Sequence, residues 1–262
     1  RWGTLTATVY PTAYWSQNRS FETVVIADSA LSPHAYPWAG GSVDWPQRFG
    51  DDAVAALDWG QTGIRLDLGA FTTGLSTANL WWGPAYRNAI VMSNAGPGFP
   101  HLDLGLGRPV GIGIGRLEGR LLWGALAESD HFDRIAANDR RFFVGLTLDW
   151  EPKWLPGLTL GVTRTFQTPW DSVGAHDVFA PFQSVFKNAF GAPTDPASND
   201  DRDQLLSLTG RWLLPESGFE VYVEWARNDH NLDLRDLLLE PDHSRAYTLG
   251  LAKTLPSGEG RV

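Results

Sequence analysis

A strict alternation of apolar and polar residues over strand-length segments is the feature that most constrains this chain. From Phe219 to Trp225 the odd positions are Phe, Val, Val and Trp, and the even positions are Glu, Tyr and Glu. Successive side chains of a β-strand point to opposite faces, so this segment has one apolar face and one face whose carboxylates need water. The same period recurs at 64–68, 144–150, 158–163, 206–212 and 247–251. The sequence therefore predicts an all-β, antiparallel fold with about ten strands.

Alternation by itself fits two architectures. In a soluble sandwich or barrel the apolar face is the core, whereas in a transmembrane β-barrel it faces lipid. Aromatic residues recur near the ends of the alternating segments, where membrane barrels carry aromatic girdles: Trp150, Phe166, Trp212 and Trp225. The 13 Trp and 28 Gly among 262 residues suit such a barrel, although a soluble carbohydrate-binding protein would also use many Trp.

The connections between these segments are of two kinds. Residues 151–157 and 215–218 have the Pro and Gly content of short hairpin turns. The segments 168–203, with a short helix expected near 178–190, and 228–244 are much longer. Short turns alternating with long loops are typical of outer-membrane barrels, so we expect an up-and-down barrel sector with long loops and short helices. Residues 16–55 lack alternation and are expected to form a long structured loop or plug.

Composition narrows the function further. A formal net charge of −9 argues against nucleic acid as a partner. No stretch of eighteen apolar residues predicts a transmembrane helix, and the absence of Cys removes disulfides and thiolate metal sites. The sequence starts in a segment with a strand-like pattern and stops just after a Gly-rich turn. We therefore expect one β-barrel domain over 1–262, incomplete at one or both ends.

Known catalytic and metal-binding patterns are missing from the sequence. No Gly-x-Ser-x-Gly elbow is present, and the six His form no HExxH motif. Glu220 and Glu224 would share one strand face about 13 Å apart, wider than glycosidases use, so they are expected to line a lumen. We therefore predict no catalytic residue, no metal and no cofactor.

The most distinctive segment contains two adjacent tryptophans that run into a Gly-Pro turn, followed by Tyr, Arg and Asn. Indole faces stack on pyranose rings, while Arg and Asn donate to hydroxyls or uronate carboxylates. The predicted polysaccharide-binding residues are Trp81, Trp82, Tyr86, Arg87, Asn88 and Asn94. The alternative is that both tryptophans wedge the loop into the barrel interior.

An ordered series of short sequence matches extends around this segment. They are DWPQRFGD at 44–51, GQTGIRL at 60–66, GLSTANLWWGP at 74–84, SNA at 93–95, GFPHL at 98–102, RPV at 108–110 and LTLGVTR at 158–164. In this series the chain resembles the Wzi family of capsule assembly proteins, which are outer-membrane β-barrels. Ala85 departs from that family, which usually has a second glycine after Trp-Trp-Gly-Pro.

The resemblance implies a location in the bacterial outer membrane and a role in capsule or exopolysaccharide assembly and surface attachment. The implied partners are capsular or extracellular polysaccharide and outer-membrane lipid, and the implied activity is binding rather than catalysis. Because the chain is acidic overall, attraction of an acidic capsule would depend on local basic groups such as Arg87, Arg108, Arg140 and Arg141.

Two other functions remain open. A sugar-selective outer-membrane porin would line its pore with Arg65, Asp67, Arg211 and Glu220. Plugging of the lumen by residues 16–55 and 81–104 would favour binding over conduction. An envelope glycan hydrolase would require a carboxylate pair or a Ser/His pair near Trp81, and the sequence reveals none.

Overall fold

One antiparallel sheet dominates the computed structural model, which describes residues 4–21, 50–128, 136, 139–183, 202–228 and 244–255. Its strands follow one another in the order β1 (Thr4–Thr8), β4 (Gly63–Leu68), β5 (Phe71–Ser76), β6 (His101–Leu106), β8 (Gly115–Ala127), β9 (Arg140–Pro152), β10 (Leu158–Pro169), β11 (Asp203–Leu214), β12 (Phe219–Asn228) and β13 (Arg245–Lys253). The short β7 (Val110–Gly111) pairs with β8, while β2 (Thr12–Ser16) and β3 (Val54–Asp58) form a separate pair. The prediction of an all-β antiparallel fold is confirmed.

The sheet is open within the described residues. Strands β1 and β13 stand at the two ends of the strand order and do not pair with each other. In the part of the chain that the structure describes, helical structure is limited to two 3₁₀ turns, η1 (Trp170–Ser172) and η2 (Asp177–Phe182). The expected helix near 178–190 is thus a 3₁₀ turn in its first part, and residues 184–190 lie outside the described residues. Among the described residues, no helix has the length and apolarity needed to cross a bilayer.

The strand registers confirm the alternation deduced from the sequence. Leu208 lies opposite Trp225, and the next residue, Thr209, lies opposite Glu224. Following the register from strand to strand assigns each side chain to one of the two faces of the sheet. The apolar face includes Ile64, Leu75, Leu102, Leu146, Leu160, Leu208, Val223 and Leu249. The polar face includes Arg65, Asp67, Asp103, Arg120, Asp149, Thr163, Arg211 and Glu224.

Over strands β11 to β13, burial on the two faces is the reverse of that in a water-soluble sheet. On the apolar face Leu249 is 69% exposed and Leu251 is 74% exposed. On the polar face Ser207 and Glu224 are almost fully buried, with exposed fractions of 0% and 1%. Since soluble proteins normally bury apolar side chains and expose carboxylates, this inversion requires an explanation.

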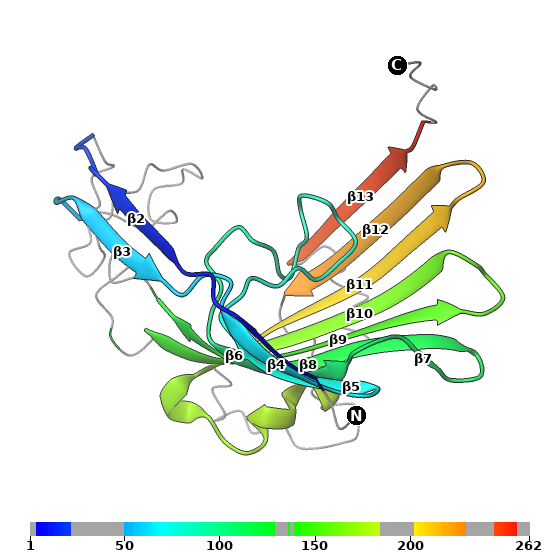
Figure 1. Ribbon diagram of the computed structural model, residues 1–262, viewed down its shortest axis with the longest axis horizontal. Coiled ribbons are helices and arrows are strands. Elements are labelled where there is room, and N and C mark those ends of the chain that lie inside the picture. Colours follow the sequence, from blue (N-terminus) through cyan, green and yellow to red (C-terminus); the bar gives the residue numbers. More distant parts are fainter. Residues whose placement is uncertain are drawn as a thin grey trace.

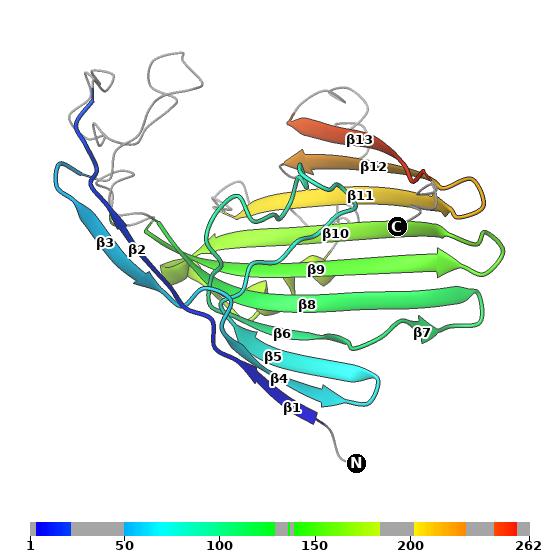
Figure 2. The same ribbon diagram turned by 45° about the horizontal axis from the view of Figure 1, so that its top comes forward.

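The sheet is curved, and the segment 77–100 lies against its polar, concave side (Figure 1). The short connections 69–70, 107–114, 153–157 and 215–218 all lie at one end of the strands (Figure 2). The longer connections, such as 77–100 and 170–202, leave from the opposite end. The hairpin turns predicted at 151–157 and 215–218 are confirmed.

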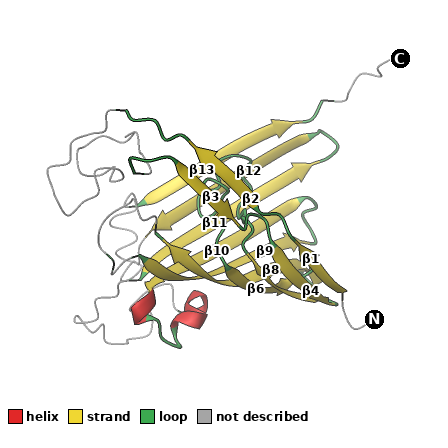
Figure 3. Cartoon of the chain, turned by 60° about the vertical axis from the view of Figure 1, so that its left-hand side comes forward, coloured by secondary structure: helices red, strands yellow, loops and turns green. Residues whose placement is uncertain are grey.

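Turns η1 and η2 lie on the opposite side of the sheet from segment 77–100 (Figure 1), where they cover part of the apolar face. Figure 3 shows the two turns in red. Val144 and Phe166 pack there against Ala180 of η2. Phe166 is only 1% exposed, so its proposed place in an aromatic girdle is wrong, because η2 covers it. Trp150 and Trp212 lie on the apolar face toward the short turns, and Trp225 lies on that face toward the long connections.

The segment 16–55, expected to be a loop or plug, is described only at its two ends. Strands β2 and β3 pair antiparallel, with Ser16 opposite Val54. Asn18 donates to the carbonyls of Gly50 and Asp52, each at 2.8 Å, and so closes the base of this connection. Residues 22–49 lie outside the described residues.

Candidate binding site

The loop 77–100, which joins β5 to β6, crosses the polar face with Trp82 as its apolar anchor. Trp82 is 6% exposed and packs against Leu122 of β8 and Phe143 of β9. Gly145 lies directly below the ring, since a Cβ added there would stand 2.8 Å from the indole. A glycine in the middle of a strand therefore makes room for one tryptophan.

Glu224 of β12 holds the same loop at a second point. Its Oε2 accepts from the backbone N–H of Ile90 at 3.1 Å, and its Oε1 accepts from the hydroxyl of Ser207 at 2.9 Å. Gly83, with φ +111°, lies against this carboxylate, and a Cβ there would come within 2.8 Å of Oε2. Only glycine combines that backbone angle with so close an approach.

Glu220, four residues from Glu224 on the same face of β12, makes the third attachment. It accepts from the hydroxyl of Tyr86 at 2.6 Å and from Nε of Arg211 at 2.7 Å. The hydrogen bond to Glu220 raises the pKa of Tyr86 above its ordinary value. The ring of Tyr86 also meets the ring of Tyr222 edge-on, with centroids 5.5 Å apart. The prediction that Glu220 and Glu224 share a face is confirmed, and their side chains fasten the loop to the sheet.

A cavity of about 540 Å³ lies between loop residues 79–84 and the polar face. Its walls are mostly charged and hydroxyl side chains of four neighbouring strands: Arg116, Glu118, Arg120, Thr147, Asp149, Glu151, Thr159, Thr209 and Arg211. Arg116 forms an ion pair with Glu151, and Arg120 lies 3.7 Å from Asp103. Gly161 leaves space for Asp149 and Thr209, because a Cβ there would lie within 2.4 Å of both side chains.

Two carboxylates face each other in this cavity. Glu118 of β8 lies directly opposite Asp149 of β9 in the ladder, and both line the cavity beside Trp81. This pair near Trp81 could not be predicted from the sequence, because the pairing depends on the register of β8 with β9. The alternation at 144–150 predicted only that Asp149 lies on the polar side of its strand.

The residues predicted to bind polysaccharide separate into three groups. Trp81 and Trp82 both line the cavity, although Trp82 is mostly buried in the loop's apolar anchor. Trp81 is 38% exposed, and its Nε1 donates to the carbonyl of Ala85 at 2.9 Å. Tyr86 lines a second hollow, beside the turn between β11 and β12. Arg87, Asn88 and Asn94 are exposed on the loop, and the Asn88 carbonyl accepts from the Thr248 hydroxyl at 3.2 Å.

The described histidines are tied into local structure. Nδ1 of the buried His101 donates to the Phe99 carbonyl at 2.7 Å, and His176 lies 3.4 Å from Asp177. Within the described ranges, no three His, Cys, Asp or Glu side chains gather as a metal site requires. His34, His131, His230 and His243 lie outside these ranges.

Comparisons of the chain with protein-family models, curated proteins and solved structures gave no match. The polarity of the two sheet faces and the cavity beneath the loop are therefore the observations from which we infer a function.

Proposed function

We propose that this chain is part of the wall of a bacterial outer-membrane β-barrel that binds capsular or extracellular polysaccharide on its inner side. The inverted burial of the sheet carries this proposal. A sheet with lipid outside and a wet lumen inside needs apolar side chains on its convex face and polar ones on its concave face. Leu249 and Leu251 on one face, and Glu224 on the other, fit that requirement.

Strand length and connection length agree with the same arrangement. Strands β8 to β13 are 9–13 residues long, and a tilted transmembrane strand needs about 9–11 residues. In outer-membrane barrels the short turns are periplasmic and the longer loops are outside the cell. We therefore assign the end that carries turn 215–218 to the periplasm.

Strands β1 and β13 need partners in such a setting. An unpaired strand edge exposes backbone N–H and C=O groups, which hydrocarbon cannot satisfy. The proposal accordingly includes further β-structure that closes the barrel between these two strands.

The cavity supports polysaccharide as the ligand. Arg116, Arg120 and Arg211 can donate to uronate carboxylates, and the threonine hydroxyls can exchange hydrogen bonds with sugar hydroxyls. Trp81 adds an apolar wall of the kind on which a pyranose ring packs. The specific role in capsule assembly comes from the family resemblance of the loop sequence.

A glycan hydrolase is the second candidate, and the Glu118–Asp149 pair favours it. Residues directly opposite in an antiparallel ladder have Cβ atoms about 4.5–5.5 Å apart. Retaining glycosidases place their two carboxyl groups about 5–5.5 Å apart, a separation that side chains on directly opposite residues can reach. A porin is less well supported, because loop 77–100 is fastened across the polar face at Trp82, Glu220 and Glu224.

The test uses the protein folded in lipid vesicles and a panel of purified acidic and neutral capsular polysaccharides. Binding, release of reducing ends and single-channel conductance are measured for the wild type and for Arg120→Gln. The exposed Lys153→Gln, in the turn between β9 and β10, also removes one positive charge and is the control. We expect tight binding of an acidic polysaccharide, weakened about tenfold or more by Arg120→Gln only.

Other outcomes separate the rival functions. Reducing ends that are released by the wild type and not by Asp149→Asn would make the protein a hydrolase. Large conductance without polysaccharide binding would make it a porin.

A further inference from the structure

Arg211 of β11 lines the cavity and is also connected to loop 77–100. Its Nε donates to Oε1 of Glu220 at 2.7 Å, and Oε2 of the same carboxylate accepts from the hydroxyl of Tyr86 at 2.6 Å. Glu220 is 8% exposed, so a buried carboxylate joins a side chain of the cavity wall to a side chain that fastens the loop. A change at either end of this series of hydrogen bonds should therefore affect the other end.

The guanidinium group of Arg211 keeps donors available for a ligand. A guanidinium carries five N–H groups in a fixed, planar fork. Its contacts with Glu220 and with the hydroxyl of Tyr86 leave several of these groups free among the described residues. The Arg211 side chain is 40% exposed, so a ligand in the cavity can reach it. Because Nε is held by Glu220, the direction of the fork is set before a ligand binds.

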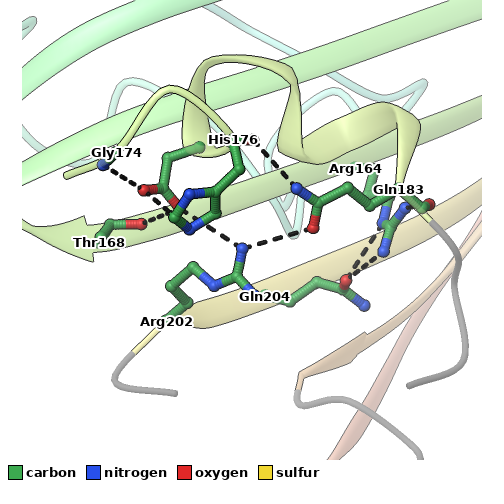
Figure 4. A network of polar contacts seen from close by, with 8 residues as sticks. Arg164, Thr168, Gly174, His176, Gln183, Arg202 and Gln204 are labelled. Carbon is green, nitrogen blue, oxygen red and sulfur yellow. Dashed lines mark hydrogen bonds and ion pairs between the residues drawn. The ribbon is translucent and has the colours of Figure 1, made fainter. Parts of the chain in front are cut away.

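Arg164, on the opposite face of the sheet, shows the contrasting arrangement. Its Nε and Nη2 donate to Oε1 of Gln204 at 3.1 and 2.6 Å, and its Nη1 donates to the carbonyls of Pro181 and Gln183 (Figure 4). Arg164 is 5% exposed, and all three of its nitrogens bind protein acceptors. It anchors η2 to the sheet, whereas Arg211 presents an accessible fork to a cavity.

Tyr86 affects the cavity only through Glu220. It does not line the cavity and lies instead against the second hollow, beside the turn between β11 and β12. Loss of its hydroxyl would leave its ring against Tyr222. The indole of Trp81 would also keep its place, because Nε1 donates to the backbone carbonyl of Ala85. Removing the hydroxyl therefore changes the support of Arg211 and leaves the aromatic wall of the cavity intact.

The groups beside Arg211 indicate which kind of sugar it would meet. An arginine fork binds a carboxylate through two parallel hydrogen bonds. Thr159 lies directly opposite Arg211 in the register of β10 with β11, and Thr209 lies two positions away on the same face of β11. Both threonines line the cavity, where their hydroxyls can exchange hydrogen bonds with sugar hydroxyls. A sugar residue that carries a carboxylate as well as hydroxyls is a uronate.

We infer that Arg211 binds the carboxylate of a uronate residue in the cavity, and that Glu220 and Tyr86 are positioning residues that hold its guanidinium for this contact. The inference rests on the proposed binding of polysaccharide and names the group that the site recognises. Coupling between two sites has the same free energy in both directions. A loop fastened at Tyr86 should therefore raise the affinity for uronate, and bound uronate should protect loop 77–100.

The experiment uses the protein folded in lipid vesicles and three uronate polymers: polygalacturonate, alginate and hyaluronan. Each polymer is also tested with its carboxyl groups reduced to alcohols. Affinities are measured for the wild type, Tyr86→Phe, Arg211→Gln and the double variant. We expect Tyr86→Phe to weaken the binding of a uronate polymer about tenfold, and to have little further effect once Arg211 is replaced. Its affinity for the reduced polymers should equal that of the wild type.

A control and two further measurements separate positioning from a general loss of structure. Tyr222→Phe is the control, since the Tyr222 hydroxyl forms no hydrogen bond with the described residues. Arg211→Lys, which can still pair with Glu220, should also bind uronate polymers more weakly because an ammonium lacks the planar fork. A bound uronate polymer should slow proteolysis within 77–100 in the wild type and should do so less in Tyr86→Phe.

Other outcomes overturn the inference in distinguishable ways. Equal affinity of the wild type and Tyr86→Phe for uronate polymers would show that Tyr86 does not position Arg211. An equal loss with the reduced polymers would show that Tyr86 touches the sugar itself. Dextran sulfate that binds as tightly as the uronate polymers would identify a general anion site. If neutral polysaccharides bind and no uronate polymer does, the uronate contact alone is wrong, and if no polysaccharide binds, the proposed function is wrong as well.

Discussion

At the scale of single residues, attachment of loop 77–100 depends on matched pairs of a large or charged side chain and a glycine. Trp82 fits over Gly145, and the carboxylate of Glu224 fits against Gly83. In each pair the two members come from parts of the chain far apart in sequence. Either partner could therefore be changed to release the loop, and the effects should be measurable.

Gly145→Ala should destabilise the folded protein by about 1–3 kcal/mol, because the new methyl group would overpack the core beneath Trp82. Urea unfolding in lipid vesicles measures the loss. Gly96→Ala is the control, since a Cβ at Gly96 meets no atom within 4 Å. Equal stability of the two variants would show that the indole does not rest on β9.

Glu224→Gln should weaken the attachment of the loop by about 1.5–3 kcal/mol, since it removes a charged acceptor from two hydrogen bonds. The rate of proteolysis within 77–100 should rise, while the strands of the sheet stay protected. Glu216→Gln, in the exposed turn between β11 and β12, makes the same chemical change without touching the loop. If proteolysis is equally slow in both variants, Glu224 does not hold the loop.

At the scale of the strands and their connections, the alternation in the sequence was sufficient to predict which side chains share a face. On β11 the apolar face carries Leu206, Leu208 and Trp212, and the polar face carries Ser207, Thr209 and Arg211. The attachment of the loop was not predictable in this way. Gly83 and Glu224 are neighbours only because β12 curves around to meet the loop, and Glu118 meets Asp149 only through register.

Under the proposed outer-membrane location, the position of the short turns predicts which end of the strands faces the periplasm. The chain has no Cys, so Ser172→Cys in η1 and Ser217→Cys in the β11–β12 turn each introduce a unique thiol. A membrane-impermeant maleimide should label Ser172→Cys on intact cells and Ser217→Cys only after the outer membrane is opened. Labelling of both thiols on intact cells would contradict the proposed orientation.

At the scale of the whole molecule, the proposed lipid-facing role makes the two faces differ in their tolerance of charge. Leu208→Arg should lower the stability of the protein in vesicles by about 2–4 kcal/mol, because its side chain would face hydrocarbon. Thr209→Arg, at the next position, should cost much less because that side chain points to the polar face. Urea unfolding in phosphatidylcholine vesicles compares the two. The reverse order of stabilities would mean that the apolar face is not exposed to lipid.

The attachments of loop 77–100 also affect the curvature of the sheet. Trp82 rests on β8 and β9, while Tyr86 and Ile90 are fastened to β12, so one short segment reaches across an arc of five strands. Only a few residues separate Trp82 from Tyr86 and Ile90 along the chain. The loop therefore limits the distance between β8 and β12. These contacts therefore limit how far this part of the sheet can flatten. Flattening the sheet would require Trp82 to lose its contacts with β8 and β9, or Glu220 and Glu224 to lose their hydrogen bonds to the loop.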